Sequence, residues 1–209
     1  SLVVQTSTSE VYGTARYVPI DEDHPLQGQS PYSASKIGAD KIAEAFHLSY
    51  GLPVATIRPF NTFGPRQSAR AIIPTIISQA LTQPKLRLGN LEPTRDLNYV
   101  ADTVQGFIRV ADCPEAVGQV FNIGSGQEIS IRELVAIILE LLGKDIPIES
   151  ESDRLRPEAS EVFRLCADNT KARETLGWQP AHTLRQGLAE TIEWVESNLD
   201  SFRSDTYSY

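Results

Sequence analysis

The sequence predicts an α/β fold built on a parallel sheet, and three observations support this prediction. Residues 1–5, 54–57 and 119–123 form apolar runs, which are typical of strands buried on both faces of a parallel sheet. Helical patterns separate these runs, as expected for parallel strands joined by crossovers. The 209 residues are 41% hydrophobic and 22% charged, which indicates a globular protein with one core or two modest lobes.

The longest predicted helix begins at Pro31 and ends near Tyr50. Proline suits the first turn of a helix, and Gly51 suits a C-terminal cap. Tyr32 and Lys36 are four residues apart and therefore share one helix face. A phenol beside an ammonium can accept a proton near neutral pH, because the positive charge favours the phenolate. The Tyr-x-x-x-Lys pattern is a weak signal by itself, since an exposed helix can carry it by chance.

Polar residues follow each of the first two predicted strands. Hydroxyls and one carboxylate lie in the segment 6–10, and the segment 58–61 follows the second strand. Ligands of open parallel sheets bind beyond the carboxyl ends of the strands. We therefore expect both segments to lie beside Tyr32 and Lys36 in one site.

The rest of the chain predicts shorter elements. A strand with alternating faces is expected at residues 86–88. Helices are expected over residues 72–81, 100–111, 130–142, 169–176 and 184–199. The helix 130–142 is apolar on most faces, which predicts that it is buried, and the charged segment 149–161 predicts a loop.

The run Gly124-Ser125-Gly126 lies between a strand and a helix, as a dinucleotide-binding turn does. However, Ile129 occupies the third glycine position, and Ser130 with Glu133 forms a capping-box pattern that explains the helix start locally. We therefore expect no cofactor at this turn.

The composition excludes several function classes. A net charge of -8 argues against a nucleic-acid partner, because phosphate binding needs a surplus of Lys and Arg. The two cysteines, Cys113 and Cys166, have neither a disulfide framework nor metal-ligand spacing. Neither a membrane-spanning stretch nor a signal peptide is evident. We expect a cytoplasmic protein without a membrane, nucleic-acid or metal partner.

The motifs and their order resemble the extended short-chain dehydrogenase/reductase family, the NAD-dependent nucleotide-sugar epimerases and dehydratases. The resemblance covers essentially the whole chain and rests on the segments 6–13, 31–36, 58–66, 94–100, 121–126 and 176–180. It implies the C-terminal part of a Rossmann-like doubly wound parallel sheet plus a smaller α/β substrate-binding lobe. The family's Gly-rich turn near the start is missing and the chain contains no methionine, so we expect part of a longer enzyme.

The expected division follows from the same resemblance. Residues 1–70 would form the C-terminal part of the NAD-binding domain with the catalytic motifs. Residues 71–200 would form mainly the nucleotide-sugar lobe, with segments returning to the first domain, and residues 201–209 would be a tail. The resemblance also implies a homodimer that pairs through the helix 31–50.

The resemblance assigns roles to individual side chains. The expected catalytic residues are Thr8, Ser9, Glu10, Tyr32 and Lys36. The residues expected to contact NAD are Thr6, Ser7, Tyr32, Lys36 and Pro59. The residues expected to contact the nucleotide sugar, a UDP sugar, are Thr8, Asn61, Arg70, Arg95 and Arg156; guanidinium groups match phosphate oxygens well.

Glu10 and Ser9 bear on the reaction type. In the family's 4,6-dehydratases an acid at the position of Glu10 removes the C5 proton. Ser9 stands where the glucose-nucleotide dehydratases have an aspartate, which leaves the general acid open between a water held by Ser9 and protonated Glu10. The Thr-Ser-Glu order is similar to both the GDP-mannose dehydratases and the UDP-glucuronate decarboxylases.

The segments 5–10, 66–75 and 93–96 are most similar to the configuration-retaining UDP-N-acetylglucosamine 4,6-dehydratases. The first expectation is therefore conversion of UDP-N-acetylglucosamine to its 4-keto-6-deoxy derivative. UDP-glucuronate decarboxylation or 4-epimerisation is the alternative. A non-enzymatic alternative is a truncated lobe that cannot bind NAD by itself.

Overall fold

A computed structural model of the chain describes residues 1–150 and 162–202. Its first sheet has the strand order β1-β2-β6 and is parallel throughout. It comprises β1 (Val3–Thr6), β2 (Val54–Pro59) and β6 (Val120–Ile123). The predicted α/β class with a parallel sheet is confirmed.

Two smaller sheets continue the fold. One has the order β3-β5-β7, from β3 (Asn61–Phe63), β5 (Thr94–Tyr99) and β7 (Glu128–Ser130), with β7 antiparallel to β5. The other pairs β4 (Leu86–Leu88) with β8 (Ile148–Ser150) in parallel. The segments that form β3, β5 and β7 are short and polar, so their sequence periodicity did not predict strands.

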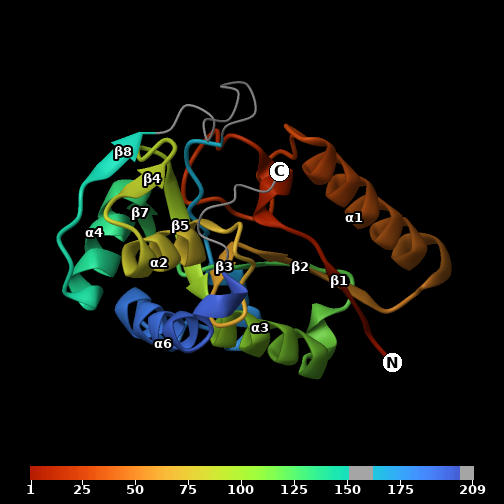
Figure 1. The fold of residues 1–209 in the computed structure, drawn as a ribbon. Helices are drawn as coiled ribbons and strands as arrows, with labels where there is room; N and C mark the ends of the chain where they lie inside the picture. The colour runs from red at the N-terminus through yellow and green to blue at the C-terminus, as the bar shows by residue number, and fades with distance from the viewer. Residues whose placement is uncertain (151–161, 203–209) are drawn as a thin grey trace.

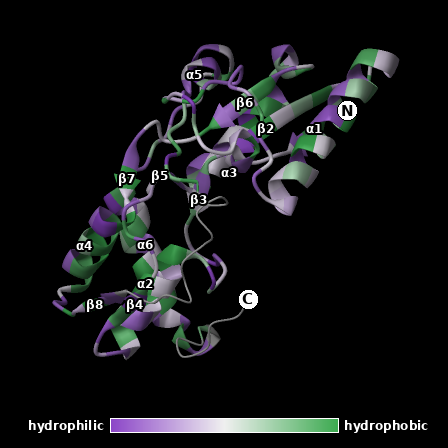
Figure 2. Cartoon of the chain, turned by 90° about the horizontal axis from the view of Figure 1, so that it is seen from above, coloured by the Kyte–Doolittle hydropathy of each residue, from purple (hydrophilic) through white to green (hydrophobic). Residues whose placement is uncertain are grey.

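The helices follow the predicted order. They are α1 (Pro31–Tyr50), α2 (Ile72–Thr82), α3 (Val100–Asp112), α4 (Ile131–Leu142), α5 (Thr170–Leu176) and α6 (Leu184–Ser197). Three 3-10 turns complete the described elements: η1 (Ser9–Tyr12), η2 (Pro114–Ala116) and η5 (Leu199–Ser201). Figure 1 shows α1 at one end and α2, α4 and α6 gathered at the other, and Figure 2 shows the same separation from above.

Three expectations need correction. β1 is only partly buried, with Val3 48% exposed, because it is the edge strand of its sheet among the described residues. α4 buries one face rather than most faces, and Leu141 is exposed. β8 begins at Ile148, so part of the expected loop 149–161 is a strand; residues 151–161 lie outside the described residues.

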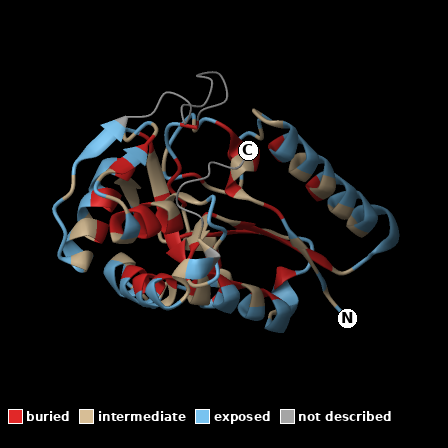
Figure 3. Ribbon diagram, viewed as in Figure 1, coloured by how far each residue is buried: buried red, intermediate tan, exposed pale blue. Residues whose placement is uncertain are grey.

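The apolar core consists of separate clusters. One joins α2, α4 and α6 to β4 and β5, and includes Ile76, Leu134 and Leu188. A second packs Phe121 and Trp178 against the first sheet. A third surrounds Tyr12, Ile20 and Phe60. Figure 3 shows most of the buried residues in the sheets and in the helices at the α2 end, whereas α1 is largely exposed. The expected domain boundary at residue 70 stays a prediction.

Two of the seven tyrosines, Tyr12 and Tyr99, have raised pKa values, which predict how the unfolding free energy changes at high pH. Burial raises the pKa of Tyr12 to about 12, against the opposing charge of Arg58. Burial, and then its hydrogen bond to Glu190, raises the pKa of Tyr99 to about 12. The folded protein therefore keeps two protons that the unfolded chain loses above pH ~10. The stabilisation is complete below pH ~10 and is lost as pH rises through ~12, at roughly 2–3 kcal/mol per tyrosine.

Urea unfolding of the full-length protein between pH 9 and 12 measures this loss. The Tyr99→Phe variant serves as the comparison, because its unfolding free energy should fall less steeply with pH. Identical slopes for the parent and this variant would contradict the assignment of Tyr99.

Candidate active site

The turn after β1 brings three polar side chains to the end of the parallel sheet. Thr8 is extended and caps η1, with its Oγ1 accepting a hydrogen bond from Glu10 N at 3.3 Å. This bond leaves the Thr8 proton to be donated elsewhere. Ser9 is buried, at 2% exposure, and Glu10 is half-buried. The turn ends at Gly13, whose φ of 63° and 2.8 Å approach of an added Cβ to Gln27 O both require glycine.

α1 places Tyr32 at the edge of the same turn. The helix begins with a reciprocal capping box between Ser30 and Ser33, with Pro31 in its first turn. Lys36 Nζ lies 6.0 Å from the centre of the Tyr32 ring and donates to Thr6 O at 3.1 Å. The predicted shared face of Tyr32 and Lys36 is therefore present. Tyr32 is 50% exposed, so its hydroxyl is open to a ligand.

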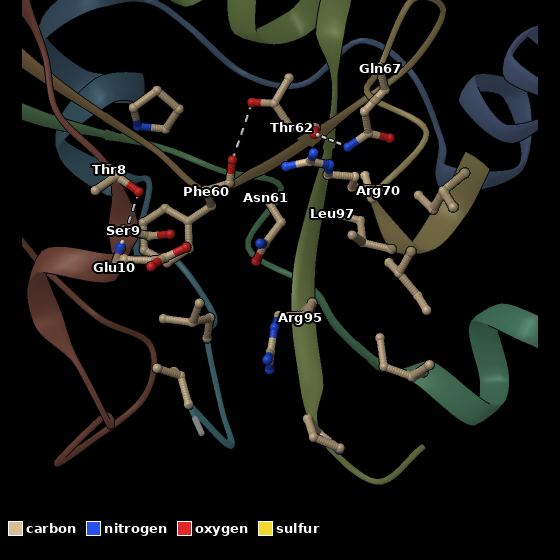
Figure 4. A pocket seen from close by; sticks show the side chains of 18 of the residues that line it. Thr8, Ser9, Glu10, Phe60, Asn61, Thr62, Gln67, Arg70, Arg95 and Leu97 are labelled. Carbon is tan, nitrogen blue, oxygen red and sulfur yellow. Dashed lines mark hydrogen bonds between the residues drawn. The ribbon is translucent and has the colours of Figure 1, made fainter. Parts of the chain in front are cut away.

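Residues 7–10 and Tyr32 form one wall of a cavity of about 550 Å³, a size common for small-molecule sites. Figure 4 shows Thr8, Ser9 and Glu10 on one side of this pocket, Arg70 and Leu97 on the other, and Asn61 between them. Arg95 Nη1 donates to Thr94 O at 2.9 Å, and the Arg95 side chain also lines the pocket. Among the described residues, the pocket lining thus holds one carboxylate, Glu10, and two guanidinium groups.

Most of the predicted site residues line this one cavity. They are Ser7, Thr8, Ser9, Glu10, Tyr32, Pro59, Asn61, Arg70 and Arg95. Thr6 and Lys36 do not line it and instead bind each other. Arg156 lies outside the described residues. The roles assigned to these residues stay predictions.

Arg58 lies elsewhere than expected. The segment 58–61 was expected in one site with Tyr32 and Lys36, and residues 59–61 do line the pocket with Tyr32. Arg58 itself is 4% exposed and pairs with Asp40 inside the protein. The two-residue periodicity of a strand explains this, because the Arg58 side chain points away from the face of its neighbours.

The apolar part of the pocket was missed by the sequence interpretation. Its walls include Phe60 and Leu165 from the cluster around Tyr12, and Leu88, Leu97 and Ile131 from the cluster around α2. Each residue is an ordinary core residue in its own segment. The wall exists only because two apolar clusters face each other across the cavity, and no local pattern records that approach.

The turn 124–126 is filled by the protein's own carboxylate. Asp96 is fully buried, and its two oxygens accept from Ser125 N at 2.7 Å, Gly126 N at 2.9 Å and Ala167 N at 2.9 Å. Ser125 Oγ adds a fourth bond at 2.6 Å. Burial raises the pKa of Asp96, and these four hydrogen bonds oppose that rise. A carboxylate occupies the place a phosphate would take, which supports the expectation of no cofactor here.

The donor set around Tyr32 fits one end of a dinucleotide. A half-exposed phenol, a lysine ammonium and small hydroxyl side chains lie at the carboxyl ends of β1 and β2, where parallel sheets bind ligands. These groups suit the hydroxyls of a ribose. The glycine turn 124–126 does not offer a phosphate site, because Asp96 fills it.

The described residues show neither a metal centre nor a membrane-spanning helix. Among residues 1–150 and 162–202, no three His, Cys, Asp or Glu side chains gather as metal ligands. None of the helices in that part of the chain is both long and apolar enough to span a bilayer.

Comparison with known sequences gives consistent matches along the chain. A family model described as GDP-mannose 4,6-dehydratase matches residues 1–191. A dTDP-glucose 4,6-dehydratase from Streptomyces griseus is 39% identical over 197 residues, which is 93% of this chain and 58% of the relative. A UDP-glucose 4-epimerase from Mycolicibacterium smegmatis is 39% identical over 200 residues, or 93% of this chain and 62% of the relative. The chain thus spans about three fifths of these curated relatives.

Solved structures share the fold. A dTDP-glucose 4,6-dehydratase from Streptomyces venezuelae, solved with NAD bound, has a TM-score of 0.86 and 32% identity, with 96% of this chain and 62% of that chain covered. A UDP-glucuronic acid 4-epimerase from Bacillus cereus, in complex with UDP-glucuronic acid and NAD, has a TM-score of 0.87 and 26% identity, with 95% and 62% covered. These matches confirm the Rossmann-like fold class, and NAD is the cofactor in both of these relatives.

Proposed function

This chain belongs to the GDP-mannose 4,6-dehydratase family of nucleotide-sugar epimerases and dehydratases, and from that premise we propose that the full-length protein is an NAD-dependent 4,6-dehydratase. Its proposed substrate is UDP-N-acetylglucosamine and its product the 4-keto-6-deoxy sugar. One observation carries the proposal: Thr8, Glu10 and Tyr32 share one cavity with two arginines. Proton-transfer groups and diphosphate-binding groups are thereby offered to one ligand.

Each residue has a defined task in this proposal. Thr6, Ser7, Tyr32, Lys36 and Pro59 would hold NAD, which when bound would accept hydride from the sugar C4 and return it to C6, with a proton added at C5. Tyr32 takes the proton of the C4 hydroxyl, and Thr8 donates a hydrogen bond that orients the C4 oxygen. Lys36 supplies the positive charge beside the phenolate.

The later steps use the next residue along the turn. Once C4 is a ketone, the C5 hydrogen is acidic, and Glu10 removes it as a general base. Loss of the C6 hydroxyl then needs a proton, which protonated Glu10 or a water held by Ser9 would supply. Ser9 is buried and lines the cavity, as a residue that holds such a water would.

The substrate end is proposed from charge and position. Arg70 and Arg95 lie across the pocket from Glu10, where they would hold the UDP diphosphate. Asn61 lies between the two sides and would contact the sugar or the phosphate. Arg156 is proposed as a third diphosphate contact on sequence resemblance alone.

The proposed assembly rests on the exposed face of α1. α1 exposes Ile42, Phe46, Leu48 and Tyr50, at 62%, 50%, 76% and 78%. An exposed apolar face of this kind supports pairing of two copies through α1. A homodimer of the full-length protein in the cytoplasm, with the division at residue 70, is the resulting proposal.

A second candidate function remains. The two curated relatives above are equally identical to this chain, and one is a 4-epimerase. UDP-glucuronate decarboxylase or 4-epimerase activity would use the same C4 oxidation, with NAD as the hydride acceptor and Tyr32 as the base. It would not require Glu10 as the base that removes the C5 proton in a dehydration.

The test is to incubate the full-length protein with UDP-N-acetylglucosamine and with UDP-glucuronate separately, and to measure the molecular masses of the products by mass spectrometry. Loss of one water from the first substrate is expected, and Glu10→Gln should abolish it. Glu44→Gln is the matched control, because Glu44 lies in α1 and forms an ion pair with exposed Lys41.

Other products would overturn the proposal. Loss of carbon dioxide from UDP-glucuronate, or an epimer of unchanged mass with no dehydration, would assign the enzyme to the second candidate. If no product forms and NAD does not bind, the result would support the non-enzymatic alternative, a lobe that cannot bind NAD by itself.

A further inference from the structure

α1 carries Tyr32 but is held by few buried side chains. Of its residues only Ser33 and Asp40 are buried. Ile37 packs partly against the cluster around Tyr12, whereas Leu48 is 76% exposed. Polar contacts therefore provide much of the attachment of this helix. An acidic side chain buried on such a helix needs a specific reason, because burial of a charge is costly unless it is paired.

Asp40 is paired with two segments that flank the pocket. Its Oδ2 accepts from Ser7 Oγ at 2.8 Å. The same oxygen accepts from Arg58 Nε and Nη2, both at 3.3 Å. Asp40 and Arg58 are 5% and 4% exposed, so this is a buried ion pair. Ser7 N also donates to Ile57 O at 2.8 Å, which fixes Ser7 against β2.

The pair belongs to a buried polar cluster of Asp40, Arg58, Tyr12 and Asn122. Arg58 Nη1 donates to Tyr12 OH at 3.0 Å, and Tyr12 OH donates to Asn122 Oδ1 at 2.7 Å. Through this cluster Asp40 joins α1 to β2, η1 and β6. Residues of η1 and the end of β2 line the pocket, and β6 pairs with β2.

Two anchors fix the helix relative to β1. Lys36 Nζ binds Thr6 O, and Asp40 binds Ser7 Oγ. Lys36 and Asp40 are one turn apart on one helix face, and their partners are consecutive residues at the end of the strand. Two such bonds restrict both rotation of α1 about its axis and sliding along it. Tyr32 lies one turn before Lys36 on that face, so its position is set by both anchors.

We propose that Asp40 is a positioning residue, which acts through Ser7 and Arg58 to hold the Tyr32 hydroxyl opposite Thr8 and Glu10. The effect on turnover rests on the function proposed above, whereas the effect on the helix does not. Weakening the anchor should lower kcat and leave KM almost unchanged, because substrate binding uses the other side of the pocket. Small displacements of a reacting group are known to cost up to roughly 100-fold in rate.

Two variants of the full-length protein test this. Ser7→Ala removes the hydroxyl that donates to Asp40, and we expect kcat to fall roughly tenfold with little change in KM. The double variant Asp40→Leu with Arg58→Met removes both charges together, so neither is left buried alone. It should show the same loss of kcat per folded molecule. Glu44→Gln, which breaks the exposed Lys41–Glu44 pair, should match the parent.

Amide hydrogen exchange provides a readout that does not depend on turnover. Residues 32–36 should exchange faster in Ser7→Ala and in the double variant, but not in Glu44→Gln. If the parent itself forms no product, the proposed function fails and exchange alone decides the positioning role. Unchanged exchange in both variants overturns the proposal, even if kcat falls, because the loss would then come from Ser7's own contacts. Lower stability with parental kcat per folded molecule also overturns it.

Discussion

On the function proposed above, full-length protein carrying Tyr32→Phe is expected to form product about 100- to 10,000-fold more slowly than the parent, the range typical for loss of a general acid–base group. The substitution removes one hydroxyl from a side chain that is 50% exposed. No buried partner is left without a hydrogen bond, so the folded structure and the unfolding free energy should be unchanged. The loss should appear in kcat rather than in KM.

Steady-state product formation and urea unfolding measure these two quantities. Tyr50→Phe is the matched control, since it removes the same hydroxyl from α1 at a position that is 78% exposed. It should retain parental turnover. Near-parental kcat in Tyr32→Phe would remove Tyr32 from the mechanism and leave Glu10 as the remaining proton acceptor in the pocket.

Asp96→Ala is expected to cause the largest loss of stability. The carboxylate is fully buried and accepts from three backbone N–H groups, those of Ser125, Gly126 and Ala167. Each of the three buried donors left unpaired costs about 1–3 kcal/mol, so the unfolding free energy should fall by about 3–9 kcal/mol. That is a large part of the ~5–15 kcal/mol that stabilises a typical domain.

Urea unfolding of the full-length protein measures this change. Asp96→Asn keeps one acceptor oxygen and should lose less than Asp96→Ala. Asp112→Ala is the control for loss of a carboxylate at an exposed position, and its unfolding free energy should stay within about 0.5 kcal/mol of the parent. Equal stabilities of the two alanine variants would show that water can replace Asp96 in the glycine turn.

The residues that sequence reasoning located correctly are those with local signals. Pro31, Gly51 and the capping residues Ser130 and Glu133 mark helix ends within a few positions, and the helices begin and end there. The polar turn after β1 follows from a rule about parallel strands, and its residues 7–10 do line the pocket. Such features depend on neighbours in the chain, so one sequence is enough to read them.

The failures have one common cause. β5 was not predicted because its residues 94–99 are mostly polar, and it is held by pairing with β3 and β7. Arg58 was placed near the ligand, although strand periodicity turns it toward Asp40. Sequence reasoning predicted neither pairing, since each depends on segments meeting in space.

By itself, the sequence determined the α/β class and the shared face of Tyr32 and Lys36. It also showed that the turn at 124–126 lacks the third glycine of a dinucleotide-binding turn. Only the tertiary structure decided that Asp96 fills the glycine turn and also accepts a hydrogen bond from Ala167 N, 71 residues away. It likewise decided that Tyr12 binds Asn122, 110 residues away. The apolar wall of the pocket opposite Glu10 was likewise decided only by the tertiary structure. Periodicity and caps act over one or two turns, whereas these contacts exist only after distant segments pack and exclude water from their polar groups.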